Sequence, residues 1–254
     1  MHSFDLSMIV FAHDEGRLLH LTITACDRAV AYAEARGWTV ERVLVLLDPT
    51  PSTGDWASEM LPRTWSSMTV RERDLGQCRN AAVRACRGSS VAFLDGGDAF
   101  DEGWLHRALS AAKYGGGDEV WHPELTLTFG DMASKRFQPD RATEENGFAG
   151  LIDANPYSSC ILARRHLFER LPFVSTDLAR GLGYPDWHWA CDVAAAGYQH
   201  RIVPDTWHYI RHGSTFFERL HPGARCRIGF LALLDRAANA AVHSGTRAAA
   251  GAER

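Results

Sequence analysis

A chain of 254 residues in which 46% of the side chains are hydrophobic and 23% are charged has the composition of a globular protein with a sizeable core. Its formal net charge of −4 argues against nucleic acid or an anionic membrane as the main partner, because both attract basic surfaces. No apolar run in the sequence approaches the roughly 20 residues that cross a bilayer, so we expect no transmembrane segment.

Apolar runs of strand length alternate with helical patterns through the first half of the chain. The expected strands are residues 7–12, 40–47, 68–71 and 91–94. The expected helices run from Leu19 to a cap at Gly37, from Gln77 to Cys86, and from an N-cap at Asp101 to near Gly115. Residues 49–55, rich in Pro, Ser, Thr and Gly, predict a loop. This order predicts a parallel sheet with right-handed crossovers, typical of a Rossmann-like nucleotide-binding half.

The second half of the chain is less regular. Strands are expected at residues 121–124, 125–129, 158–163 and 199–203. Helices are expected after Ala163, from Pro185 and over residues 228–234. Residues 135–141 predict a polar loop, and residues 237–254, rich in Ala, Gly and Arg, predict a flexible tail.

The most informative stretch is residues 91–98, Val-Ala-Phe-Leu-Asp-Gly-Gly-Asp. It predicts a buried strand that ends in two carboxylates, Asp95 and Asp98, separated by two glycines. Open α/β sheets bind their ligands at this edge, and two nearby carboxylates suit a divalent cation beside a phosphate. An ordinary Asp/Gly turn is the alternative interpretation.

The segment from Asp74 to Asp98 resembles the family-2 glycosyltransferases, nucleotide-sugar-dependent enzymes with the GT-A fold. Their pattern is N-x-G-x-x-x-A-R-N-x-G, then a helix closed by A-x-G, then a strand that ends F-L-D-x-D-D. The matching residues here are Gly76, Arg79, Asn80, Ala85, Gly88, Phe93, Leu94, Asp95 and Asp98. The resemblance implies an α/β fold with a mixed, mostly parallel GT-A sheet between helices, in one domain over residues 1–236. Residues 1–115 would bind the nucleotide sugar and residues 116–236 the acceptor.

The resemblance also implies a set of nucleotide contacts. The family sequence I-P-x-x-N-E after the first strand corresponds to residues 11–15, and the aspartate that ends the second strand, which contacts the base, corresponds to Asp48. The implied contacts are Ala12, His13, Glu15, Asp48, Arg79, Asp95 and Gly96. From the residues alone, Asp48 also suits a turn before Pro49, and Arg79 an exposed helix position.

A second matching stretch, residues 183–197, resembles the family motif E-D-W-x-L-x-x-R-x-x-x-x-G. Its aspartate corresponds to Asp186, which in relatives is the general base for the acceptor hydroxyl, and its glutamate to Pro185. An acid in the first turn of a helix is also favourable as a simple cap. Trp187, Trp189 and Trp207 are candidates for stacking on an acceptor sugar, although core packing would also explain them.

The metal site is where the chain departs from the family pattern. The second metal-binding aspartate of the family corresponds to Gly97, so the implied ligands of Mn²⁺ or Mg²⁺ are Asp98 and His212, with His208 the competing histidine. If this metal site does not form, Asp98 caps a turn, and Arg and Lys alone neutralise the leaving group.

The function that the resemblance implies is transfer of a sugar from a nucleoside-diphosphate sugar to an acceptor hydroxyl of a saccharide or small molecule, with inversion. A non-catalytic nucleotide-binding domain is the second hypothesis. A sugar-1-phosphate nucleotidyltransferase is the third, although residues 11–16 lack its G-x-G-T-R loop. Residues 1–6 lack the basic start of a secretory signal and the six cysteines form no C-x-x-C pair, so we expect buried thiols and a cytoplasmic location.

Overall fold

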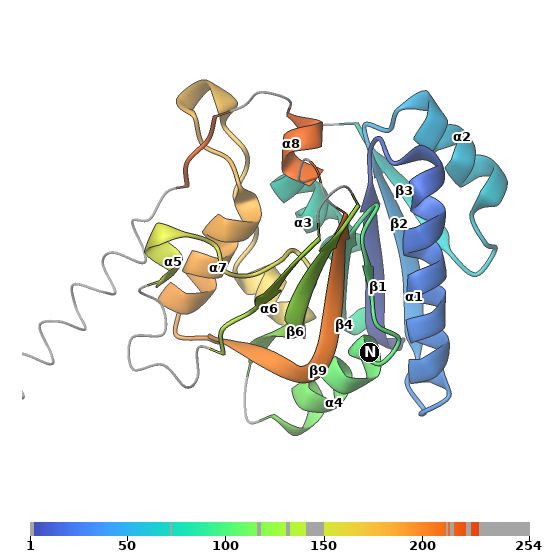
Figure 1. The fold of residues 1–254 in the computed structure, drawn as a ribbon, viewed down its shortest axis with the longest axis horizontal. Helices are drawn as coiled ribbons and strands as arrows, with labels where there is room; N and C mark the ends of the chain where they lie inside the picture. Colours follow the sequence, from blue (N-terminus) through green and yellow to red (C-terminus); the bar gives the residue numbers. More distant parts are fainter. Residues whose placement is uncertain are drawn as a thin grey trace, which may run out of the picture.

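The computed structural model describes residues 3–71, 73–115, 118–130, 133–140, 150–211, 213, 216–221 and 225–228. Within these residues one nine-stranded sheet has the order β3-β2-β1-β4-β8-β6-β9-β5, with β7 paired to β6 (Figure 1). The strands are β1 (Phe4–Ala12), β2 (Val40–Leu47), β3 (Ser66–Val70), β4 (Gly88–Asp95), β5 (Ala99–Phe100), β6 (Glu119–Phe129), β7 (Ser134–Phe137), β8 (Ile161–Arg164) and β9 (Gln199–Arg211). The helices are α1 (Leu19–Glu34), α2 (Pro51–Met60), α3 (Leu75–Ala85), α4 (Trp104–Tyr114), α5 (Gly150–Asp153), α6 (Arg165–Arg170), α7 (Pro185–Ala195) and α8 (Phe216–Leu220).

The strands β3, β2, β1 and β4 pair in parallel, as the alternation of strands and helices predicts. The central strand β1 pairs with β2 and β4 over most of its length, with Met8 opposite both Arg42 and Ala92. Beyond β4 the sheet becomes mixed, because β8 runs antiparallel to β4 while β6 and β9 run parallel to each other. The carboxyl ends of the parallel strands therefore meet at one edge of the sheet.

Two hydrophobic clusters fill the two faces of the sheet. Side chains alternate along a strand, so Leu6, Met8 and Val10 of β1 pack on one face with α1 and α4. Ile9 and Phe11 pack on the other face with α3, α6, α7 and α8. Figure 1 shows α8 above the upper ends of the strands, at the edge where β1 and β4 end.

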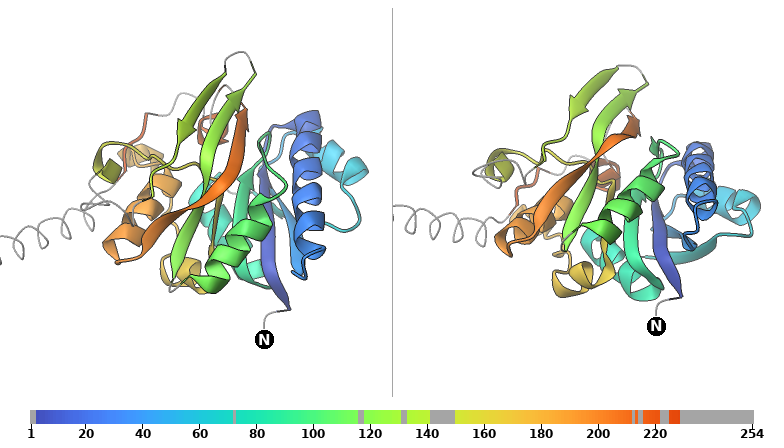
Figure 2. Two further views of the ribbon diagram at one scale, coloured as in Figure 1. Left: turned by 60° about the horizontal axis from the view of Figure 1, so that its bottom comes forward. Right: turned by 90° about the horizontal axis from the view of Figure 1, so that it is seen from below.

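Two segments expected as loops form regular elements in the structure. Residues 49–55 contain the start of α2 instead of a loop, because Pro51 is tolerated in a first helical turn and Trp56 anchors the helix in the core. Residues 134–137 form β7, which pairs with β6 instead of lying in a polar loop. Figure 2 shows this β6–β7 ribbon extending beyond the rest of the sheet.

Two strands are longer than the sequence pattern indicates. Residues 119–129 form one strand, β6, with an irregularity between Pro123 and Leu125 where two short strands are expected. The strand β9 continues to Arg211 because its second half pairs with β6 and β5. It therefore carries His208 and Arg211 to the edge where β4 ends.

Other expectations concern burial and the end of the chain. All six cysteines are free, five of them are buried, and no described helix is long and apolar enough to cross a membrane. The predicted ligand His212, most of the expected helix at residues 228–234 and the expected tail at residues 237–254 lie outside the described residues.

Candidate active site

A pocket of about 280 Å³ opens at the edge of the sheet where β4 and β9 end. Its charged lining residues are Asp95, Asp98, Asp186, Arg136, Arg211 and Arg219. They come from the β4 turn, the first turn of α7, and β7, β9 and α8, so the pocket brings together both halves of the chain. Of the predicted site residues, Asp95, Asp98 and Asp186 line it.

Arg79 connects two of these acids from behind the pocket. Its guanidinium is fully buried, forms a 3.3 Å ion pair with Asp95 and contacts Oδ1 of Asp186. The guanidinium carbon also lies 5.3 to 5.5 Å from the ring centres of Phe11, Phe93 and Phe173. Burial lowers the pKa of Arg79, although the charge of Asp95 opposes this shift. Arg79 therefore holds carboxylates in place, and its predicted contact with a nucleotide remains untested.

Asp186 lies where a helix begins. Tyr184, with φ of +53°, turns the chain into Pro185, and Asp186 follows in the first turn of α7. A negative charge there is stabilised by the helix dipole. Arg79 contacts Oδ1, whereas the second oxygen, Oδ2, makes no hydrogen bond within the described part of the chain, and Asp186 lines the pocket.

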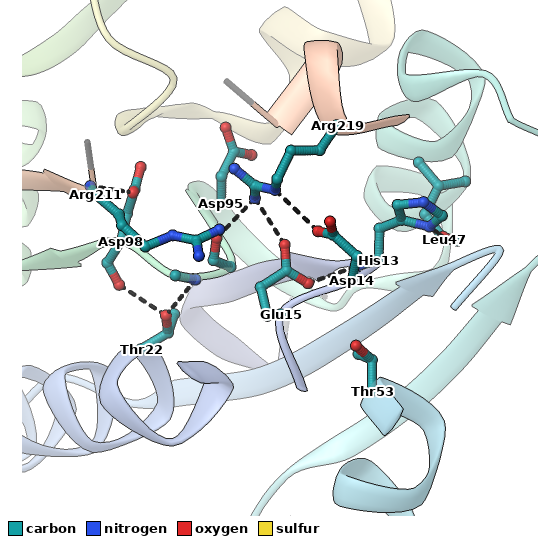
Figure 3. Close-up of polar contacts among 12 residues, drawn as sticks. His13, Asp14, Glu15, Thr22, Leu47, Thr53, Asp95, Asp98, Arg211 and Arg219 are labelled. Carbon is teal, nitrogen blue, oxygen red and sulfur yellow. Dashed lines mark hydrogen bonds and ion pairs between the residues drawn. The ribbon is translucent and has the colours of Figure 1, made fainter. Parts of the chain in front are cut away.

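The turn after β1 is tied to helix α8 (Figure 3). Glu15 is buried and accepts a hydrogen bond from the backbone N–H of His13 at 2.6 Å. Arg219 donates to Glu15 at 2.7 Å, to Asp14 at 2.9 Å and to the Gly96 carbonyl at 3.2 Å. Burial opposes the charge of Arg219, but Glu15 and Asp14 outweigh it and raise the pKa of Arg219. These contacts join the β1 turn to the β4 turn.

Gly96 permits this close approach. Its N–H donates to the Phe11 carbonyl at 2.7 Å, and a Cβ added at Gly96 would lie 2.8 Å from Glu15 side-chain atoms. Only glycine fits between these groups without displacing them.

Asp98 is held by β9 and α1. Its Oδ1 accepts the backbone N–H of Arg211 at 2.9 Å, and its Oδ2 lies 3.4 Å from Nε2 of the buried His208. Its carbonyl accepts a 2.8 Å hydrogen bond from Thr22. Figure 3 shows Asp98 and Thr22 on one side of the site and Arg219 on the other.

Asp48 and His13 lie beside the pocket and do not line it. Asp48 has a φ of +40° and forms a 2.6 Å ion pair with Arg73. His13 is buried, and its Nδ1 lies 2.9 Å from the Leu47 carbonyl and 2.7 Å from that of Asp48. The imidazole thus joins the ends of β1 and β2.

The three tryptophan candidates have different environments. Trp187 is partly buried, lines the pocket and donates from its indole N–H to the Leu151 carbonyl at 2.8 Å. Trp189 stacks on Phe168 and Phe173 in the core. Trp207 is exposed and does not line the pocket. Core packing explains Trp189, and of these three side chains only Trp187 lines the pocket.

The residues described around Asp98 do not form a complete divalent-metal site. No group of three or more His, Cys, Asp or Glu side chains suited to a metal ion occurs among the described residues, and the predicted ligand His212 is outside them. Among the described histidines only His208 faces Asp98, and the guanidinium of Arg211 lies over Gly97.

Sequence reasoning missed Arg211 and Arg219 as site residues. Arg211 precedes His212 in the stretch on which the metal prediction rests, and the family pattern there indicates the histidine as the ligand. Arg219 has no sequence signal, because its partners Asp14 and Glu15 are about 200 positions away.

The comparisons with known proteins bear on the fold. The sequence matches no family model and no curated protein sequence. Its structure is similar to S. aureus TarS 1–349 in complex with UDP-GlcNAc, with a TM-score of 0.61 and 15% identity over 85% of this chain and 60% of that one. It is also similar to the UDP complex, with a TM-score of 0.55, 14% identity and coverage of 85% and 63%. The chain thus spans about 60% of the TarS chains in these two complexes.

These two neighbours hold UDP-GlcNAc and UDP. The same TarS segment without ligand gives a TM-score of 0.60 at 12% identity, over 91% of this chain and 71% of that one. At such identities the likeness shows the fold, which is the predicted GT-A fold: one mixed α/β sheet, mostly parallel, between flanking helices. The fold and the pocket together define a GT-A protein with an acid-lined and arginine-lined site at the carboxyl edge of its sheet.

Proposed function

We propose that the chain is a glycosyltransferase that moves a sugar from a nucleoside-diphosphate sugar to an acceptor hydroxyl. The observation that carries this proposal is the Asp95–Arg79–Asp186 arrangement, in which one buried guanidinium holds an acid of the β4 turn and an acid of α7 at one pocket. The UDP and UDP-GlcNAc complexes of its structural neighbours support a uracil nucleotide as the first donor to test.

Asp186 is the proposed general base. Its Oδ2 takes the proton of the acceptor hydroxyl as the hydroxyl oxygen forms a bond to the anomeric carbon of the donor. The bond from that carbon to the diphosphate oxygen breaks, and the diphosphate leaves with the electron pair. Attack from the side opposite the leaving group inverts the anomeric centre.

The nucleotide would lie across the ends of β1, β2 and β4. Its proposed contacts are Ala12, His13, Glu15, Asp48, Asp95 and Gly96. The β1 turn is fixed for such a role, because His13 is tied to β2 and Glu15 is tied to Arg219. Trp187 of α7 lines the pocket and is the proposed contact with the acceptor. A divalent cation held by Asp98 and His212, which the family resemblance implies, is one of two competing ways to neutralise the diphosphate, the other being arginine side chains.

The proposal is tested in two steps. Calorimetric titration with UDP and other nucleoside diphosphates first identifies the nucleotide, and UDP release from a panel of UDP-sugars in the presence of saccharide acceptors then measures transfer. We expect Asp186→Asn to lower turnover by about 10²–10⁴-fold while the donor affinity is kept, because the amide cannot accept a proton.

The matched control is Asp192→Asn on the same helix. Asp192 is partly buried beside His188 and does not line the pocket, so its variant is expected to turn over within a few-fold of the wild type. Asp186→Asn activity close to that of the wild type would show that the base lies elsewhere.

A non-catalytic nucleotide-binding protein is the second candidate, and Gly97 favours it because a carboxylate of the family pattern is missing there. UDP binding without turnover of any UDP-sugar would support this candidate and contradict transfer.

A further inference from the structure

The space beside Gly97 is filled by a positive group. The φ of Gly97 is +88°, and a Cβ added there would lie 3.1 Å from Nε and 3.6 Å from Nη2 of Arg211. A carboxylate at this position would therefore project against the Arg211 guanidinium. Position 97 therefore lacks the aspartate of the family pattern, and the Arg211 guanidinium lies over its backbone instead.

A second guanidinium, that of Arg219, contacts the neighbouring residue, Gly96. Arg219 donates to the Gly96 carbonyl at 3.2 Å and is fixed by Asp14 and Glu15. Arg211 and Arg219 both line the pocket and come from opposite sides of the β4 turn (Figure 3). Within the described part of the chain, the Arg211 side chain makes no hydrogen bond or ion pair, so its donors are available to a ligand.

These arginines disfavour a divalent ion beside Gly97, because like charges repel most strongly in a partly buried site. Asp98 is the acid that remains on this turn, and its Oδ1 is already taken by the backbone N–H of Arg211. Its Oδ2 faces His208 at 3.4 Å. An Asp98–His208 pair is therefore the metal site that the described residues would offer, and the experiment below tests for it.

We infer that Arg211 and Arg219 bind the diphosphate of the donor in place of a divalent cation, so that donor binding requires no metal. The inference rests on the proposed function. A guanidinium presents paired N–H donors that match phosphate oxygens and keeps its charge at all physiological pH values. As the bond between the anomeric carbon and the diphosphate breaks, the negative charge develops on the diphosphate, where both arginines can stabilise it.

The test is calorimetric titration of the full chain with UDP and, separately, with uridine, in EDTA and in Mn²⁺. For the wild type we expect UDP affinities that agree within about threefold in the two buffers. Arg211→Gln is expected to weaken UDP binding about ten- to hundredfold, since a hydrogen bond to a charged group is lost, while uridine binding stays within about threefold.

The control is Arg63→Gln, which removes the same charge from an exposed arginine between α2 and β3. It is expected to leave both affinities unchanged. Arg211→Lys keeps the charge without the paired donors and guards against misfolding of the Gln variant. We expect it to bind UDP more weakly than the wild type and still without a need for Mn²⁺.

Two results would overturn the inference. UDP affinity that rises more than about tenfold with Mn²⁺ in the wild type would show that donor binding uses a metal, and a fall to the EDTA value in His208→Gln would identify the Asp98–His208 pair as its site. Unchanged UDP binding in Arg211→Gln would remove that arginine from the diphosphate site. Failure of the wild type to bind any nucleotide or nucleotide sugar in either buffer would instead overturn the proposed function, and the inference with it.

Discussion

Replacement of Arg79 by methionine tests whether one buried guanidinium organises the site. Arg79→Met keeps much of the side-chain length and removes the charge. The side chain of Arg79 is 0% exposed, while those of its partners Asp95 and Asp186 are 11% and 26% exposed. The variant would therefore leave two carboxylates close together, largely screened from water and without their shared counter-charge.

The expected loss of stability follows from this burial. Removing one partner of a buried ion pair costs about 3–5 kcal/mol. Water reaches part of Asp186, so we expect the lower end of this range, about 3 kcal/mol. In a chain of this size, that loss corresponds to a fall in Tm of roughly 6 °C or more.

Urea unfolding followed by tryptophan fluorescence measures this effect. Arg73→Met is the control, because Arg73 forms an ion pair with Asp48 in which the side chains are 53% and 44% exposed. Such an exposed pair contributes less than about 1 kcal/mol. If Arg79→Met were also within about 1 kcal/mol of the wild type, Arg79 would not be a buried support for the two acids.

Three further predictions use other parts of the structure. Asp48→Ala is expected to weaken UDP binding by about 1–3 kcal/mol while the fold is kept, and equal affinities in titration would exclude Asp48 from the nucleotide site. Burial alone would raise the pKa of Glu41, but hydrogen bonds from Ser7 and Arg87 outweigh burial and lower that pKa. The ionised Glu41 carboxylate therefore stabilises the fold above about pH 4.3, and this stabilisation is lost as the pH falls through the lower pKa of the folded state. Glu41→Gln should therefore be destabilised in urea at neutral pH, and this difference should shrink at about pH 3. Gly76→Ala would place its Cβ against the Val174 carbonyl and should lose about 1–3 kcal/mol in thermal unfolding, whereas Gly54→Ala on α2, which meets open space, should lose none.

The parallel half of the fold was predictable because its signals are local. Apolar runs gave the positions of β1, β2 and β4, and the Asp-Gly-Gly-Asp sequence marked the turn where β4 ends. The start of α2 was missed because Pro, Ser, Thr and Gly favour loops, while burial of Trp56 favours the helix. The strand β7 was missed because its exposed polar residues have no apolar alternation, and pairing with β6 supplies its hydrogen bonds.

The candidate site divides in the same way. The sequence by itself determined which acids end strand β4 and begin helix α7, because helix and strand boundaries depend on neighbouring residues. Only the tertiary structure decided that Arg79 holds Asp95 and Asp186 together and that Arg211 lies over Gly97. Arg79 and Asp186 are more than 100 positions apart, and such pairs form only when the sheet and its helices have brought distant segments together. Ion pairs between distant residues depend on how the sheet and helices pack, and no local pattern of residues predicts them.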